Sequence, residues 1–82
     1  MKIVYVDQKR LMNIEKHGLD FADLDLEFFR DSVVVEAKER RLKAVGRFRD
    51  SSIAVVFATL GTEAISIISM RPASRDERSL LS

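Results

Sequence analysis

The sequence predicts a single α+β domain over residues 1–82. Helical apolar stripes and capping residues lie before residue 31 and after residue 73, whereas short β-branched runs fill the segment between them. The length fits one small domain. The expected order is a short N-terminal strand, two helices, a four-stranded antiparallel meander and a C-terminal helix. Such runs of helices and strands favour helices packed on one face of a sheet.

The N-terminal third of the chain predicts the short strand and the first two helices. Lys2–Val6 is β-branched and predicts a strand. Asp7 is expected to cap the first helix and Gly18 to end it. A second helix is expected to begin at Asp20. Its apolar stripe has helical spacing and consists of Phe21, Leu24 and Phe28.

The first two strands of the meander follow residue 31. Residues 32–37 and 40–48 are the strand segments. In the second of them, alternation puts Leu42 and Ala44 on one face and leaves three residues for the other face. Those three are Lys43, Val45 and Arg47.

The last two strands are more apolar. Residues 53–60 are apolar almost throughout, as expected of a central strand covered on both faces. Residues 50–52 predict the turn before this strand, and Gly61-Thr62 predicts a two-residue hairpin after it. The apolar phase of residues 64–70 slips between Ile67 and Ile68, which indicates a bulge or burial on both faces. Pro72 is expected to end the strand. Ser74 and Glu77 then form a capping-box pattern for the final helix.

The composition excludes several classes of protein. There is no cysteine, so the chain has no disulfide, thiolate nucleophile or cysteine-based zinc site. The net charge of +1 is unlike that of a uniformly basic nucleic-acid binder. The longest apolar run is far short of the ~20 residues that span a bilayer, and no signal peptide is visible. We therefore expect a cytoplasmic protein that does not enter a membrane.

The charges are nonetheless unevenly distributed. The segment from Glu15 to Asp31 is acidic, whereas residues 38–49 and 71–78 are basic. Such runs are typical of solvated faces, and basic runs of this kind also form anion-binding surfaces. Both interpretations remain open at the level of sequence.

Three motifs in series resemble a known family. The first has the form K-x-x-x-N-x-x-K-H-G-x-x-F and consists of Lys9, Asn13, Lys16, His17, Gly18 and Phe21. The second, E-x-R-x-x-x-x-G, consists of Glu39, Arg41 and Gly46. The third is "IISMRPASRDER" near the end of the chain. Together they resemble the BrnT-type toxins of bacterial type II toxin–antitoxin systems, over nearly the whole chain and in the same order.

The resemblance implies a RelE-like fold and a ribonuclease toxin that cleaves RNA to arrest growth. It also implies a BrnA-like antitoxin with a ribbon-helix-helix part, through which the complex binds promoter DNA. The toxin itself would then contact DNA only indirectly. The expected enzyme is a metal-independent endoribonuclease without a cofactor. A dimer within the complex is left open.

Several positions depart from the family pattern. Phe57 stands where a tyrosine is usual, and Leu60 and Ser66 stand where arginines are usual. Pro72 replaces a basic residue after Arg71. These departures leave an alternative open, in which the chain is a catalytically degenerate binding module that keeps the toxin fold and the antitoxin-binding surface.

RNA cleavage by 2′-hydroxyl attack needs a base, an acid and cations that neutralise the phosphorane. Arg41 and Arg71 match family positions and suit the cationic role, because a guanidinium stays charged and fits phosphate oxygens. His17 is the candidate acid or base. Glu36 and Glu39 are further bases, although pairing across the hairpin is their usual role. The candidate RNA-binding residues are Lys16, Lys43, Arg47, Arg75 and Arg78.

Each candidate also has a purely structural interpretation. The arginines can be solvated or can form surface ion pairs, and Arg71 can pair with Glu77. His17 and Lys16 lie in the last turn of the predicted helix, where a cation interacts favourably with the exposed carbonyls. A metal site at His17 is disfavoured, because there is no second histidine and no cysteine.

Overall fold

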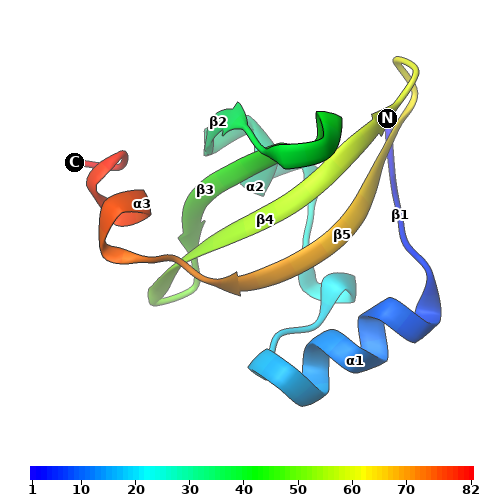
Figure 1. Ribbon diagram of the computed structural model, residues 1–82, viewed down its shortest axis with the longest axis horizontal. Helices are drawn as coiled ribbons and strands as arrows, with labels where there is room; N and C mark the ends of the chain where they lie inside the picture. Colours follow the sequence, from blue (N-terminus) through cyan, green and yellow to red (C-terminus); the bar gives the residue numbers. More distant parts are fainter.

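The computed structural model describes residues 1–82 as a curved five-stranded sheet with helices on both faces (Figure 1). The strand order is β1-β5-β4-β3-β2. None of the helices has the length and apolar composition needed to cross a membrane. The elements in chain order are β1 (Lys2–Val4), α1 (Asp7–His17), the 3-10 turn η1 (Phe21–Asp23), α2 (Leu26–Asp31), β2 (Val33–Glu36), the 3-10 turn η2 (Lys38–Arg40), β3 (Leu42–Phe48), β4 (Ser51–Leu60), β5 (Ala64–Pro72) and α3 (Arg75–Ser79).

The expected antiparallel meander is confirmed for β2 to β5. The short strand β1 adds a fifth, parallel strand, which pairs with Ala64–Ser66 at the start of β5. Beyond Ser66 the edge of β5 has no strand beside it. Helix α1 contacts β5 there and lies along the lower edge of the sheet in Figure 1.

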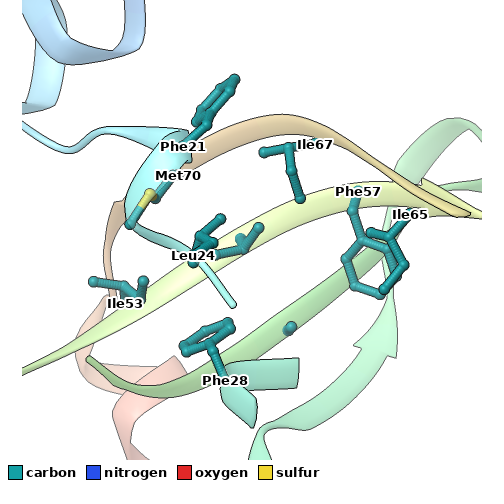
Figure 2. Close-up of a cluster of buried hydrophobic side chains, with 10 residues drawn as sticks. Phe21, Leu24, Phe28, Ile53, Phe57, Ile65, Ile67 and Met70 are labelled. Carbon is teal, nitrogen blue, oxygen red and sulfur yellow. The ribbon is translucent and has the colours of Figure 1, made fainter. Parts of the chain in front are cut away.

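The main core lies between the inner face of the sheet and the segment that contains η1 and α2. The expected stripe of Phe21, Leu24 and Phe28 is buried, and Figure 2 shows these side chains against residues of β4 and β5. Phe28 also lies against the backbone of β3, because Gly46 has no side chain: a Cβ atom there would stand 2.9 Å from the Phe28 ring. The helical segment and the sheet therefore form one continuous apolar layer.

A smaller cluster covers the outer face of the sheet. Val45 of β3, Ala54 of β4 and Ala73 are buried together, and Leu81 packs against them. The chain that carries α3 therefore crosses to the face opposite α2. The expectation of helices on one face only was wrong, because Val45 and Ala54 make an apolar strip on the outer face, against which Ala73 and Leu81 pack.

Two helix starts differ from the expectation. Val6, not Asp7, is the N-cap residue of α1, and Asp7 is the first helical residue. The expected second helix is divided: Asp20 caps the short turn η1, and Asp25 caps α2 by accepting a hydrogen bond from the Phe28 N–H at 2.9 Å. The end of the first helix is confirmed, because Gly18 takes the left-handed conformation at φ +70°.

The hairpin turns are displaced by about one residue. Arg49 and Asp50 form the turn between β3 and β4, so Ser51 and Ser52 belong to β4. The loop before β5 has three residues, Gly61 to Glu63, rather than two, because Leu60 pairs directly with Ala64.

The bulge in β5 is confirmed. Phe57 pairs with Ile67 and Val56 pairs with Ser69, so Ile68 has no partner on β4. The strand ends at Pro72 as expected. The capping box of Ser74 and Glu77 is present at the start of α3.

Candidate functional site

Cationic side chains gather on the outer face of the sheet, at the end where β3 begins. A hollow of about 650 Å3, here called the sheet hollow, lies there. Arg41 immediately precedes β3, Lys43 lies on β3 and Arg71 lies on β5. The full lining is Glu36, Ala37, Lys38, Glu39, Arg41, Lys43, Val56 and Arg71.

A second hollow of about 620 Å3, here called the helix hollow, lies between α1 and β5. Its lining is Lys9, Met12, Asn13, Glu15, Lys16, His17, Arg41, Ile68 and Ser69. Arg41 lines both hollows, so it joins them into one basic surface. The three candidate catalytic residues, Arg41, Arg71 and His17, therefore lie along one stretch of the molecule.

The remaining predicted RNA-binding residues divide into two groups. Lys16 lines the helix hollow and Lys43 lines the sheet hollow. Arg47 and Arg78 come together elsewhere, in a smaller hollow of about 310 Å3 between the β3–β4 turn and α3. Arg75 lines none of the four hollows.

Glu77 binds two of the predicted cations. Its side chain is 9% exposed, and its two oxygens accept hydrogen bonds from Arg71 Nη1 and Nη2, each at 2.7 Å. Lys43 Nζ lies 2.8 Å from the same carboxylate. The carboxylate also accepts the Ser74 N–H of the capping box at 2.9 Å. The predicted structural role of Arg71, pairing with Glu77, is therefore what its geometry shows.

These contacts favour the ionised form of Glu77. Hydrogen bonds from Arg71, aided by those from Lys43 and Ser74, hold the pKa of the Glu77 carboxyl far below its usual range, although burial opposes the shift. The same pair raises the pKa of Arg71. Arg71 and Lys43 thus share the single negative charge of Glu77.

Arg41 is less constrained than Arg71. Its nearest carboxylate oxygen belongs to Glu39 at 3.6 Å, and the Glu39 side chain is 75% exposed. An exposed pair of this kind contributes at most ~1 kcal/mol. Most of the Arg41 guanidinium donors therefore remain available to an anion.

The backbone before Arg41 is strained. Glu39 and Arg40 both have positive φ angles, of 62° and 64°. The Arg41 N–H donates to the Lys38 carbonyl at 3.2 Å and closes this tight turn. Left-handed residues other than glycine cost about 1 kcal/mol each. The turn directs the chain into β3 with Arg41 on the outer face.

Asn13 fixes the position of α1 on the sheet. Its side-chain amide donates to the Leu19 and Met70 carbonyls, and its oxygen accepts the Met70 N–H at 3.0 Å. These bonds occupy the part of the β5 edge that β1 does not reach. The bond to Leu19 is local, whereas the bonds to Met70 join α1 to a strand distant in the sequence. They place Lys16 and His17 beside the sheet.

His17 is half-buried in the last turn of α1, as its sequence position predicted. No group of three or more His, Cys, Asp or Glu side chains is arranged to hold a metal ion. The arrangement around His17 and Arg41 can bind a phosphate and offer an imidazole for proton transfer.

A further hollow, of about 670 Å3, differs in charge from the basic surface. It lies between α2 and the β3–β4 turn, and its charged lining consists of four carboxylates and two arginines, Arg47 and Arg49. Those carboxylates belong to Asp23, Asp25, Glu27 and Asp31. Because the carboxylates outnumber the arginines, this hollow attracts phosphate less than the basic surface does.

Residues 5–77 match the family model described as the ribonuclease toxin BrnT of type II toxin–antitoxin systems. The chain belongs to the BrnT family. The mixed α+β fold agrees with that family, which implies an RNA substrate and an antitoxin partner.

A solved BrnT structure supports the assignment. The crystal structure of the Brucella abortus ribonuclease toxin BrnT shares 53% sequence identity with this chain, at a TM-score of 0.86. The match covers 92% of this chain and 99% of that one. A comparison with curated protein sequences finds no match.

The departures from the BrnT pattern fall in different environments. Phe57 lies in the inner core, where its ring centroid is 5.2 Å from that of Phe29. A tyrosine at this position would place its hydroxyl on the core face of the sheet. Its replacement by Phe57 therefore leaves the basic outer surface unchanged. Leu60 is 52% exposed beside the β4–β5 loop, Ser66 is half-buried on β5, and Pro72 is exposed at the end of that strand.

Sequence reasoning missed part of this BrnT surface. Methionine is by default a core residue in sequence reasoning, but Met12 is 62% exposed and lines the helix hollow. Ile68 lines the same hollow, and the phase slip of β5 was its only signal. Glu77 had been named as a cap and a partner of Arg71, but nothing in the sequence pointed to Lys43.

Proposed function

We propose that this chain is a metal-independent endoribonuclease toxin, acting in the cytoplasm, and that Arg41, Arg71 and His17 form its active site. The observation that carries the proposal is that Arg41 lines both basic hollows, with Arg71 in one and His17 in the other. In this scheme a phosphate lies against Arg41 and the arginine stabilises the charge of the phosphorane. Arg71 orients the site through Glu77, and His17 transfers a proton.

The proposed partner is a BrnA-like antitoxin with a ribbon-helix-helix part. Membership of the BrnT family supports a protein partner. The resemblance of the three sequence motifs to BrnT-type toxins supports an antitoxin of the BrnA type. In this proposal the toxin reaches promoter DNA only through the antitoxin, and the complex contains a dimer. Lys16 and Lys43 border the proposed phosphate site, whereas Arg47, Arg75 and Arg78 extend RNA binding toward α3.

The test compares Arg41→Ala with Arg30→Ala in protein freed of antitoxin. Arg30 is an exposed arginine of α2, so its replacement removes the same charge outside the proposed site. We expect wild type and Arg30→Ala to cleave single-stranded RNA in the presence of EDTA, and Arg41→Ala to cleave about 100-fold more slowly. Thermal unfolding should be equal in the two variants. Undiminished cleavage by Arg41→Ala would reject the site.

The alternative, a degenerate binding module, has one observation in its favour: Glu77 already offsets the charge of Arg71 and Lys43. It predicts that wild-type protein binds the antitoxin tightly, leaves RNA intact and does not arrest growth when expressed alone. RNA cleavage by wild type that Arg41→Ala abolishes would exclude this alternative.

A further inference from the structure

We propose that the helix hollow binds one unpaired nucleobase of the RNA, next to the phosphate at Arg41. The inference rests on the proposed function, because it takes RNA as the ligand. It adds a base-binding site to the phosphate site and names Met12 and Ile68 as the residues that contact the base.

The bulge in β5 supplies one apolar wall of the hollow. Ile67 and Met70 are both buried in the inner core, at 1% and 0% exposure. In a regular strand, side chains on the same face are an even number of residues apart. Ile67 and Met70 share the inner face although two residues, Ile68 and Ser69, lie between them, so the bulge has added one residue. The additional residue places an isoleucine at the outer surface, where it lines the hollow beside α1.

Helix α1 supplies the opposite wall. Lys9, Met12 and Lys16 follow one another at helical spacing and all line the hollow. The thioether of Met12 is apolar and adaptable, and the methylene stems of the two lysines extend that apolar surface while their charged ends stay in water. Asn13 holds this face of α1 against β5, so the two walls are fixed relative to one another.

The rim of the hollow is cationic. Lys9, Lys16 and Arg41 line it with one carboxylate, that of Glu15. An apolar cleft with a cationic rim fits a planar base whose ribose is flanked by phosphates. The volume of about 620 Å3 lies within the usual range of about 300–1,000 Å3 for small-molecule sites.

The position of Arg41 connects the two sites. Since Arg41 lines both hollows, a phosphate bound to it has the helix hollow on one side and the Arg71 cluster on the other. A base enters the helix hollow only after it leaves a duplex stack, so the substrate is single-stranded. Both amide hydrogens of Asn13 are already bonded to carbonyls, which leaves few fixed groups to distinguish one base from another.

The experiment measures the binding of a short, single-stranded RNA in which the 2′-hydroxyl at the cleavage position is replaced by hydrogen. A series of otherwise identical oligonucleotides carries one abasic nucleotide at successive positions. We expect the abasic change at one position to raise the Kd of wild type about tenfold. Met12→Ala should bind the intact and the abasic RNA with equal Kd, at the weaker value.

Leu11→Ala is the matched control, because Leu11 precedes Met12 on α1, is 58% exposed and lines no described hollow. It should keep the tenfold effect. Equal thermal unfolding of the two variants is expected, since both side chains are exposed. A Met12→Trp variant should bind the intact RNA more tightly, because an aromatic ring stacks on a base.

The outcomes separate this inference from the nuclease proposal. RNA binding with no abasic effect in wild type, or with the same effect in Met12→Ala, overturns the base site and leaves the nuclease proposal standing. Loss of antitoxin binding alone in Met12→Ala also overturns it and assigns the hollow to the protein partner. An abasic effect without RNA cleavage supports the base site and rejects the nuclease. Absence of RNA binding by wild type rejects both.

Discussion

Glu77 is the residue on which the geometry of the outer face depends most. It caps its own helix, pairs with Arg71 through two hydrogen bonds and contacts Lys43 on a third element. A nearly buried carboxylate is stable only when such partners satisfy it. The spacing of Ser74 and Glu77 predicted the helix cap, and the nearby Arg71 predicted the ion pair. The contact with Lys43 requires α3 to fold over both β3 and β5, which no local pattern specifies.

Replacing Glu77 by Gln should change the pH dependence of stability. The folded-state pKa of Glu77 lies below its ordinary value of about 4.5, so the ionised form stabilises the fold above that pH. This contribution is lost as the pH falls below about 4.5 toward the lowered pKa. We expect wild type to be about 2 kcal/mol more stable than the variant at pH 7, with the difference shrinking in acid. Urea unfolding at a series of pH values measures it.

Asp76→Asn is the control for Glu77→Gln, because Asp76 is the exposed neighbour on the same helix. Its stability should follow that of wild type across the pH range. The Asp20 carboxyl, whose pKa is lowered by its hydrogen bond to Arg10, contributes to acid unfolding equally in all three proteins. A difference between wild type and Glu77→Gln that stays constant from pH 7 into acid would contradict the role assigned to Glu77.

At the scale of elements, α1 is attached to the sheet mainly through Asn13. We expect Asn13→Ala to lower the free energy of unfolding by about 2 kcal/mol, because the Met70 N–H and two carbonyls lose their partner in a buried place. RNA binding should weaken as well, since Lys16 and His17 lie on the same helix.

Gln8→Ala serves as the comparison for Asn13→Ala, since Gln8 is an exposed residue of the same helix. Urea unfolding should give nearly the same stability for Gln8→Ala and wild type. If Asn13→Ala proved as stable as Gln8→Ala, the bonds between Asn13 and β5 would not be what holds the helix.

The elements that could be predicted are those with a local signal. The central strand β4, the end of α1 at Gly18 and the bulge at Ile68 all follow from apolar phase or glycine position. The sharp turn before Arg41 could not be predicted, because its left-handed residues, Glu39 and Arg40, are neither glycine nor asparagine. The parallel pairing of β1 with β5 and the side taken by α3 depend on contacts distant in sequence.

At the scale of the whole molecule, opposite charges are separated although the net charge is only +1. The basic surface occupies the two hollows that share Arg41. The acidic hollow between α2 and the β3–β4 turn carries four carboxylates and two arginines. Charges more than about 10 Å apart in solution are largely screened at 0.1 M salt. RNA affinity should therefore follow the local charge of the basic surface and not the total charge of the chain.

The salt dependence of RNA binding tests this separation. The double variant Lys16→Ala, Arg41→Ala removes two positive charges from the basic surface, whereas Glu27→Gln, Asp31→Asn removes two negative charges from the acidic hollow. Each neutralised phosphate contact contributes about 0.7 to the slope of log Kd against log salt concentration for a single strand. We expect the first variant to reduce the slope by about 1.4 and the second to leave it unchanged. Equal and opposite changes in slope would show instead that binding responds to net charge, and the basic surface would lose its special role. Fluorescence anisotropy with a labelled, uncleavable single strand between 50 and about 300 mM salt covers the range in which such slopes are resolved.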